Sequence, residues 1–128
     1  MQKDFDKWNM IKKEIHWKKF PVFCHPREIW WCSLGINVGF EQDGTGKNYE
    51  RPALILKGFN QYVSLILPLT TSIKKNKYHL PLGVVNGKEA FAIISQIRLI
   101  DTKRLINKVG VINKKTFENI KKTVKDLL

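Results

Sequence analysis

The sequence of 128 residues has little of several features that define common protein classes. It contains only two cysteines, Cys24 and Cys32, which excludes the multiple disulfides of small secreted domains, and we expect both thiols to be reduced. No apolar run approaches the roughly 18 residues that span a membrane. The first ten residues, MQKDFDKWNM, lack the apolar core of a signal peptide. We therefore expect a cytoplasmic protein with no membrane partner.

Motifs of the common catalytic and metal-binding classes are also missing. There is no phosphate-binding P-loop, no GxSxG elbow, no HExxH pair and no dinucleotide-binding glycine fingerprint. The spacing of Cys24, His25 and Cys32 matches no standard zinc site. A magnesium site would have to use three carboxylates of one glycine-rich segment, a poor scaffold for octahedral geometry: Glu41, Asp43 and Glu50. The sequence therefore predicts neither a metal nor a cofactor.

Acidic residues are scarce, with 11 Asp and Glu against 23 Lys and Arg, for a net charge of +12. The excess is uneven: +4 in residues 1–27, −1 in residues 28–69 and +9 in residues 70–128. Such a balance favours an anionic partner, which is nucleic acid, an acidic protein or a membrane surface. The alternative is that the lysines only solubilise the outer faces of helices.

Two segments have the periodicity of amphipathic helices. In residues 4–20, apolar residues recur three and four positions apart, before Pro21 and Pro26 end the helix: Phe5, Trp8, Ile11 and Ile15. We expect this stripe to dock on the barrel or on a second protomer. In residues 113–128, Asn113 is a suitable N-cap. The apolar face of this second helix comprises Ile112, Phe117, Ile120, Val124 and Leu127.

The residues between the helices favour short strands. We predict strands at EIWWCSL, PALILKGF and YVSLILPLT, a short strand around residues 78–82, and one long strand at EAFAIISQIRLID. GFNQ joins the second and third strands as a hairpin, and residues 35–50 form a polar loop. Alternation sends Trp30 and Trp31 to opposite faces, one to the core and one to the surface. The pattern indicates an α+β protein built on a small antiparallel, barrel-like sheet.

One arrangement of residues indicates chemistry. Arg51 precedes Pro52 at the start of one predicted strand, and the next strand ends in three hydroxyl residues, Thr70, Thr71 and Ser72. If these strands pair as a hairpin, Arg51 and Thr70 meet at one rim of the sheet. A guanidinium binds phosphate well, and a hydroxyl beside it can donate or accept a proton. The pair suits attack of an RNA 2′-OH on its own phosphodiester, a reaction that needs no metal.

In these residues the sequence resembles the PemK/MazF-like toxins of bacterial type II toxin–antitoxin pairs. The resemblance runs from about Arg27 to the C-terminus and is carried by REIWWCSLG, GFEQ, RPALIL, LPLTTS and SQIRLID in that order. It implies an SH3-like barrel of the CcdB/Kid/PemK type with a C-terminal helix in residues 27–128, preceded by an N-terminal helical extension in residues 1–26. It also implies a homodimeric, metal-independent endoribonuclease that cleaves single-stranded RNA and is blocked by a cognate acidic antitoxin.

The resemblance assigns roles to several positions. It places the catalytic arginine and threonine on Arg51 and Thr70, and an assisting glutamate on Glu41. It places RNA-binding residues in and beside the same motifs: Gln42, Thr71, Ser72 and Gln96. Lys74 and Lys75, in the basic loop that follows Ser72, are two further candidates for RNA binding. Two departures stand out, namely the longer segment DGTGKNYE before Arg51 and Ser95 where an acidic residue is common. The alternative function is a non-catalytic barrel that binds a protein target, as CcdB-like toxins do.

Overall fold

The computed structural model describes residues 3–35, 44, 49–72 and 76–128. Within these ranges no helix is long and apolar enough to cross a membrane. The elements in chain order are helix α1 (Phe5–His16), strands β1 (Glu28–Ser33), β2 (Glu50–Gly58), β3 (Val63–Thr70), β4 (His79–Val85) and β5 (Lys88–Ile93), 3₁₀ turn η1 (Ile94–Gln96), strand β6 (Arg98–Asp101), 3₁₀ turn η2 (Thr102–Arg104), strand β7 (Leu105–Val111) and helix α2 (Lys114–Leu127).

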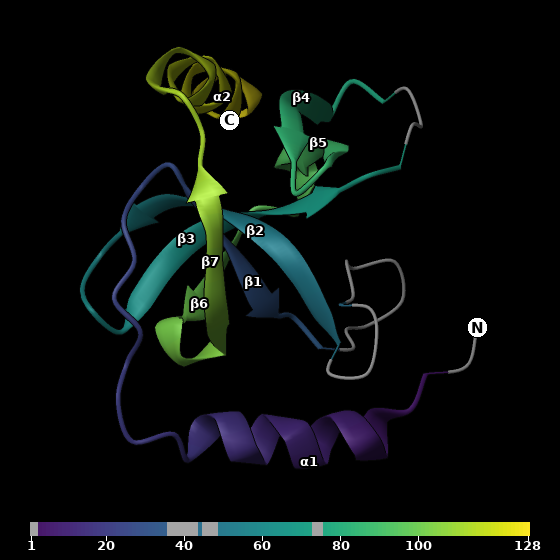
Figure 1. Ribbon diagram of the computed structural model, residues 1–128, viewed down its shortest axis with the longest axis vertical. Coiled ribbons are helices and arrows are strands. Elements are labelled where there is room, and N and C mark those ends of the chain that lie inside the picture. Colours follow the sequence, from purple (N-terminus) through teal and green to yellow (C-terminus); the bar gives the residue numbers. More distant parts are fainter. Residues whose placement is uncertain (1–2, 36–43, 45–48, 73–75) are drawn as a thin grey trace.

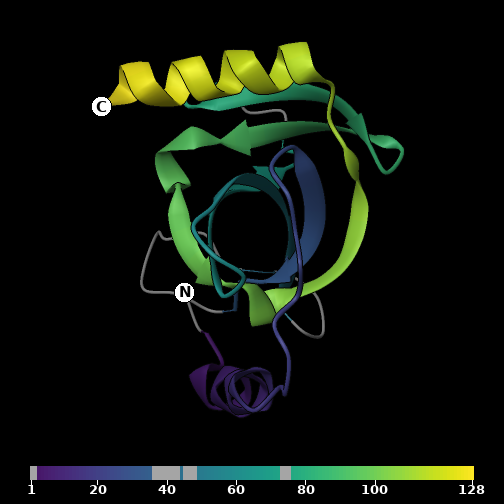
Figure 2. The same cartoon turned by 90° about the vertical axis from the view of Figure 1, so that its left-hand side faces the viewer.

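The strands form one antiparallel sheet in the order β4-β5-β3-β2-β1-β7, and β6 pairs with the other half of β3. The sheet curls strongly into a half-barrel, and Figures 1 and 2 show α1 and α2 on opposite sides of it. The predicted β2–β3 hairpin is confirmed, and Asn60 closes its turn by accepting hydrogen bonds from the amides of Tyr62 and Val63. The prediction of an α+β fold on a curled antiparallel sheet is thus confirmed.

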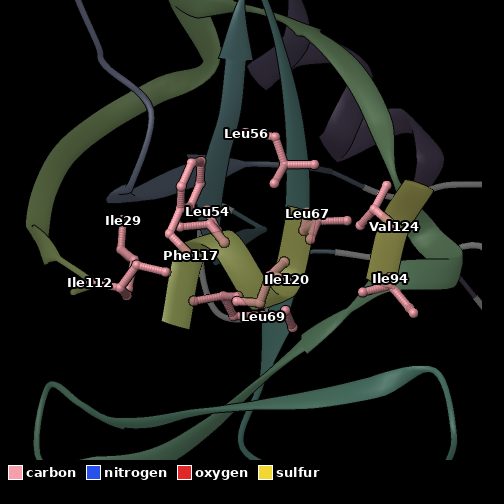
Figure 3. Packing of buried hydrophobic residues seen from close by; sticks show 11 residues of the cluster. Ile29, Leu54, Leu56, Leu67, Leu69, Ile94, Ile112, Phe117, Ile120 and Val124 are labelled. Carbon is pink, nitrogen blue, oxygen red and sulfur yellow. The ribbon is translucent and has the colours of Figure 1, made fainter. Parts of the chain in front are cut away.

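The core divides into two clusters because successive residues of β2 point to opposite faces of the sheet. Leu54 and Leu56 face the first cluster, which α2 covers, and Figure 3 shows side chains of both elements packed together there. Ala53 and Ile55 face the second cluster, in the interior of the curl, with residues of β1, β3, β6 and β7. Both faces of β2 are therefore buried, which matches its nearly continuous apolar sequence.

Helix α2 begins where the sequence predicts, because the Asn113 side chain accepts a hydrogen bond from the Thr116 amide at 2.8 Å. Phe117, Ile120 and Val124 are buried as expected. Leu127 is not, since 39% of its surface stays exposed near the chain end. The predicted apolar face of α2 is therefore correct except for its last turn.

Helix α1 is present, but it docks less than its apolar stripe predicts. Trp8 is its one buried residue and is 5% exposed, whereas Phe5 is 51% exposed and Ile11 and Ile15 are half-buried. Within one copy of the chain, Trp8 is therefore the one residue of the stripe that docks fully on the barrel, and docking of the others on a second protomer stays a prediction. The helix lies across the end of the curled sheet (Figure 1), and its Trp8 ring packs beside Gly35, which follows β1.

The segment EAFAIISQIRLID is not one long strand as predicted. β5 ends at Ile93, η1 turns the chain, and β6 begins at Arg98. The break has a topological cause, because β5 pairs with Leu69 and Thr70 of β3 whereas β6 pairs with Val63–Ile66. The chain must therefore pass from one end of β3 to the other.

Two further differences concern strands at the sheet edges. β4 extends to Val85, beyond the predicted residues 78–82, and meets β5 through a turn at Asn86 and Gly87. β7 was not predicted, and it is an edge strand in which polar residues and glycine interrupt the apolar ones.

The two tryptophans of β1 are both half-buried, and the predicted division holds in that Trp30 lies toward the core, although it is not fully buried. The pairing of β1 with β7 shifts register just before Trp30 and just after Trp31. The buried core positions on either side are occupied by Ile29 and Cys32. Trp30 packs against the second cluster.

Candidate active site

The β2–β3 register brings Arg51 and Thr70 to the same rim of the sheet. Ala53 pairs with Pro68, and extending this register by two residues places Arg51 opposite Thr70. The Arg51 guanidinium donates a hydrogen bond from Nη1 to the carbonyl oxygen of Leu69, at 3.1 Å. The arginine is thus anchored to the strand that carries the threonine, as the sequence predicts for a hairpin.

A pocket of about 590 Å³ opens at this rim and contains both residues. Thr71 and Ser72, which follow β3, also line it. The remaining walls come from β1, β2, β3, β7 and the β4–β5 hairpin: Trp31, Pro52, Leu69, Val85, Asn86, Lys88, Ala90 and Val109. Four of the predicted site residues therefore meet in one cavity.

The pocket is suited to an anion. Arg51 and Lys88 both line it, and none of the described residues that form its walls is acidic. The Thr70 Oγ1 accepts a hydrogen bond from the backbone amide of Ser72 at 3.1 Å, which orients this oxygen and leaves its proton to be donated in another direction. A guanidinium, an ammonium and several hydroxyls at one rim can together bind the oxygens of a phosphodiester.

Sequence reasoning missed Lys88 and Trp31 as pocket residues. A usable signal for Lys88 existed in the sequence VVNGKE, because Asn-Gly between β-prone residues indicates a two-residue hairpin turn. Asn86 and Gly87 have φ values of +52° and +80°, as such a turn requires, and Val85 pairs with Lys88. Trp31 reaches the pocket only because β1 pairs with β2, where Trp31 lies opposite Pro52.

The other predicted site residues do not join this group in the described structure. Gln96 lies half-buried in η1 and is not among the residues that line the pocket. Four more lie outside the described residues: Glu41, Gln42, Lys74 and Lys75. Among the described ranges, no three His, Cys, Asp or Glu side chains are placed to hold a metal ion.

The two thiols are poorly placed to act as nucleophiles. Cys32 lies in the second core cluster with no exposed surface, and burial raises its pKa to about 12. Burial also raises the pKa of Cys24, whose Sγ lies 3.5 Å from Ser64 Oγ. Thiolates are the reactive form of cysteine, so neither thiol is set up to act as a nucleophile.

Helix α1 packs against Tyr49, the residue that precedes β2 and lies two positions before Arg51. The amides of Leu34 and Gly35 donate to the carbonyl of Tyr49 at 3.2 and 3.1 Å, which joins the end of β1 to the start of β2. The Trp8 ring packs edge-on against the Tyr49 ring, with 5.8 Å between the ring centroids. The Trp8 ring also lies so close to Gly35 that a Cβ atom on this residue would be only 2.0 Å from the ring. We call Leu34, Gly35 and Tyr49 the neck.

Comparisons with known structures identify the fold. MazF from Deinococcus radiodurans superposes with a TM-score of 0.69 at 17% identity, over 83% of this chain and 96% of that one. The Mycobacterium tuberculosis toxin MazF-mt6 gives 0.60 at 17% identity, over 78% and 94% of the two chains. A mycobacterial endoribonuclease in complex with its cognate antitoxin gives 0.60 at 13% identity, over 81% and 93%.

The sequence comparisons complete the identification. None of the curated protein sequences is similar enough to this one to count as a relative. The sequence does match, over residues 25–128, the family described as the PemK-like, MazF-like toxins of type II toxin–antitoxin systems. This match covers most of the chain and includes every described residue of the pocket, and the fold agrees with it. The chain therefore belongs to the PemK/MazF-like toxin family.

Proposed function

We propose that this protein is the toxin of a type II toxin–antitoxin pair and a metal-independent endoribonuclease that cleaves single-stranded RNA in the cytoplasm. The observation that carries the proposal is the meeting of Arg51 and Thr70 in a cationic pocket with no acidic residue among its described walls. The family match supports it. In this proposal residues 27–128 form the catalytic domain and residues 1–26 an extension of it.

In the proposed reaction the RNA 2′ oxygen bonds to the adjacent phosphorus while the bond from phosphorus to the 5′ oxygen breaks. The products are a 2′,3′-cyclic phosphate and a 5′-hydroxyl end. Arg51 binds the phosphate oxygens and stabilises the negative charge that develops on them, and Lys88 adds a second cation. The Thr70 hydroxyl relays a proton between the 2′ oxygen, which loses one, and the 5′ oxygen, which gains one.

The remaining sequence predictions complete this proposal. Glu41 assists catalysis, and the residues that bind RNA comprise Gln42, Thr71, Ser72, Lys74, Lys75 and Gln96. We further propose a homodimer and an acidic antitoxin as the inhibitory partner. The net charge of +12 suits both an acidic protein and RNA. The mycobacterial endoribonuclease that was solved in complex with its cognate antitoxin supports the antitoxin as a partner.

The test is incubation of the purified protein with a long RNA in excess EDTA, followed by mapping of the cut sites and of the chemistry of the new ends. We expect cleavage that leaves cyclic phosphates, since no step of the proposed reaction uses a metal. Arg51→Ala and Thr70→Ala should each lower the rate by roughly 10²–10³-fold, the usual cost of removing a charge-stabilising donor. Both side chains lie at the sheet rim, so the fold should survive.

Lys57→Ala is the matched control, because Lys57 is an exposed cation toward the other end of the same strand. It should cleave like the wild type. An Arg51→Ala variant as fast as the wild type would contradict the assignment of Arg51. A wild-type protein that cuts no RNA would instead favour the alternative of a barrel that binds a protein target.

A further inference from the structure

A second cavity lies between α1 and η2, outside the pocket that contains Arg51. It has a volume of about 300 Å³, and its walls include Lys12, Lys13 and His16 from α1 and Lys103 and Arg104 from η2. We call it the α1–η2 groove. The matched family region begins at residue 25, so the α1 wall of this groove is an addition to the family domain.

The groove has an excess of positive charge. Four cations line it against one carboxylate, Asp101, which accepts a hydrogen bond from the Lys103 amide at 2.8 Å and so caps η2. Within the described part of the chain, none of these four cations forms an ion pair with a carboxylate. An excess of like charge in a concave site attracts an anion.

Two lysines bridge the walls of the groove through backbone carbonyls. The Lys103 Nζ donates to the carbonyl oxygen of His16 at 3.2 Å, and the Lys18 Nζ donates to that of Lys103 at 3.0 Å. These bonds hold α1 against η2 and satisfy a carbonyl at the helix end. Because carbonyls are neutral, the bonds order the ammonium groups without cancelling their charge.

The groove lies within reach of an RNA strand bound at Arg51. Cys32 of β1 pairs with Arg51 of β2 on one side and with Leu105 of β7 on the other. Arg104, next to Leu105, is therefore about two strand spacings from Arg51 along the sheet, roughly 10 Å. Figure 1 shows that β2 begins at the end of the sheet that faces α1.

An aromatic ring accompanies the cations. Trp17 directly follows His16, is 79% exposed, and lies edge-on to the His16 ring at 5.0 Å. An exposed flat ring beside ordered lysines is the arrangement that proteins use for single-stranded nucleic acid, where bases stack and phosphates pair with cations. An acidic peptide would instead need apolar pockets for its anchoring side chains, and Ile15 is the one apolar residue among the described residues that line this groove.

We propose that the α1–η2 groove binds a phosphodiester of the single-stranded RNA a few nucleotides from the scissile bond, with a base stacked on Trp17. The proposal rests on the proposed function for the nature of the ligand. The groove holds the substrate and takes no part in the chemistry, so it governs the affinity for long RNA and leaves the rate of cleavage of bound RNA unchanged.

The first experiment measures binding without cleavage. The probe is a labelled 2′-O-methyl oligonucleotide, which lacks the attacking hydroxyl, titrated at several salt concentrations. The salt slope is the slope of the logarithm of the binding constant against the logarithm of the salt concentration. Two variants should make it less steep: the double variant Lys12→Gln, Lys13→Gln and the triple variant that adds Lys103→Gln. The expected change is about 0.7 for every phosphate that the variant no longer neutralises. The double variant removes no hydrogen bond that holds α1 to η2, which guards against loss of the fold.

The matched control removes three charges from exposed positions of α2, with Lys114→Gln, Lys115→Gln and Lys122→Gln. Its slope should stay close to that of the wild type. Trp17→Ala should weaken binding by roughly 5- to 150-fold, the range for removal of one base–aromatic stack, and leave the salt slope unchanged. If the groove variants and the α2 variant have equal slopes, the groove proposal is wrong.

The second experiment separates the groove from the cleavage pocket. With long RNA, the groove variants should have a higher KM than the wild type and the same kcat. With a short RNA that fills only the pocket, the groove variants and the wild type should cleave at the same rate. A wild type that cuts no RNA, while the groove variants still flatten the salt slope, would refute the proposed function and support the groove. Variants that lose affinity for a poly-glutamate peptide but not for the oligonucleotide would overturn the proposal in favour of a peptide site.

Discussion

The two terminal helices differ sharply in how they attach to the sheet, although the same periodicity predicted both. α2 has 14 residues and buries Phe117, Ile120 and Val124 in the first core cluster. α1 has 12 residues and buries only Trp8. An amphipathic pattern therefore predicts that a helix docks, but the depth of docking depends on what the sheet presents to it.

The sheet presents different surfaces to the two helices. α2 lies over leucines from the middle of β2 and β3, which form a broad apolar face (Figure 3). α1 meets the end of the sheet, where its tryptophan fits against the neck because Gly35 lacks a Cβ. The first arrangement stabilises the whole domain. The second holds one local structure and leaves most of the α1 surface exposed, as a binding surface requires.

The largest effect on stability should come from α2. Phe117→Ala should lower the free energy of unfolding by about 3–5 kcal/mol, because it leaves a cavity in the first core cluster. Urea unfolding followed by circular dichroism measures this loss. Leu127→Ala on the same helix is the control, and it should cost well under half as much because Leu127 is partly exposed. Equal losses for the two variants would show that α2 does not pack as described.

A smaller and more local effect is expected from α1. Trp8→Ala should cost about 2 kcal/mol, the value of one large apolar side chain taken from water. Once α1 detaches, the rest of the domain should stay folded, because the sheet keeps both of its core clusters. Hydrogen exchange should therefore speed up in α1 and at the neck and stay unchanged in β2 and β3.

Met10→Ala is the control for this prediction, since Met10 lies on α1 but is 68% exposed. Gly35→Ala tests the same packing from the sheet side, because its Cβ would collide with the Trp8 ring. If Trp8→Ala instead unfolds the whole chain in one cooperative step, α1 belongs to the core and the contrast with α2 fails.

The sequence predicted the Arg51–Thr70 pair because both residues lie on one local hairpin. β2 and β3 are consecutive strands, and their apolar runs and the intervening turn determine which ends meet. The rest of the pocket depends on pairings between distant segments. Lys88 reaches the pocket because β5 pairs with β3, and Trp31 reaches it because β1 pairs with β2. The Asn-Gly pair before Lys88 indicates the β4–β5 turn, but no local pattern shows which strand this hairpin or β1 pairs with, so these residues were missed.

The same reasoning explains why the α1–η2 groove was not predicted. Its lysines on α1 and those on η2 are separated by about ninety positions in the sequence, and each resembles an ordinary solvated lysine when considered alone. β7 was missed for a different reason. At the sheet edge, its mostly exposed residues need no strict apolar alternation.

The segment that follows α1 and the segment that precedes α2 are hydrogen-bonded to each other at the start of β1. We call this contact the joint. The Arg27 Nε donates to the carbonyl of Ile112 at 3.1 Å, and the Ile112 amide donates to the carbonyl of Arg27 at 3.0 Å. Next to it, Glu28 is buried and accepts hydrogen bonds from the His25 amide at 2.7 Å and the Trp30 indole at 3.0 Å. Lys108 of β7 forms an ion pair with its other oxygen at 2.9 Å.

This joint should make a small, pH-dependent contribution to stability. Burial alone would raise the pKa of Glu28, but the hydrogen bonds from Lys108, Trp30 and the His25 amide outweigh it and lower the pKa from 4.5 to about 2. Because the folded pKa lies below the unfolded one, the ionised carboxylate stabilises the fold. Its contribution is complete above pH 4.5 and is lost as the pH falls toward 2.

Glu28→Gln should therefore cost about 1.5 kcal/mol near neutral pH, the usual value of a hydrogen bond to a charged group. The difference from the wild type should shrink steadily as the pH falls below 4.5, because the wild type then loses the same charge. Urea unfolding of both proteins across this range measures the difference. Glu118→Gln, which removes an exposed carboxylate of α2, is the control and should change stability little at any pH. A Glu28→Gln deficit that stays constant down to pH 2 would show that the packing of Glu28, and not its charge, holds the joint between the two helices.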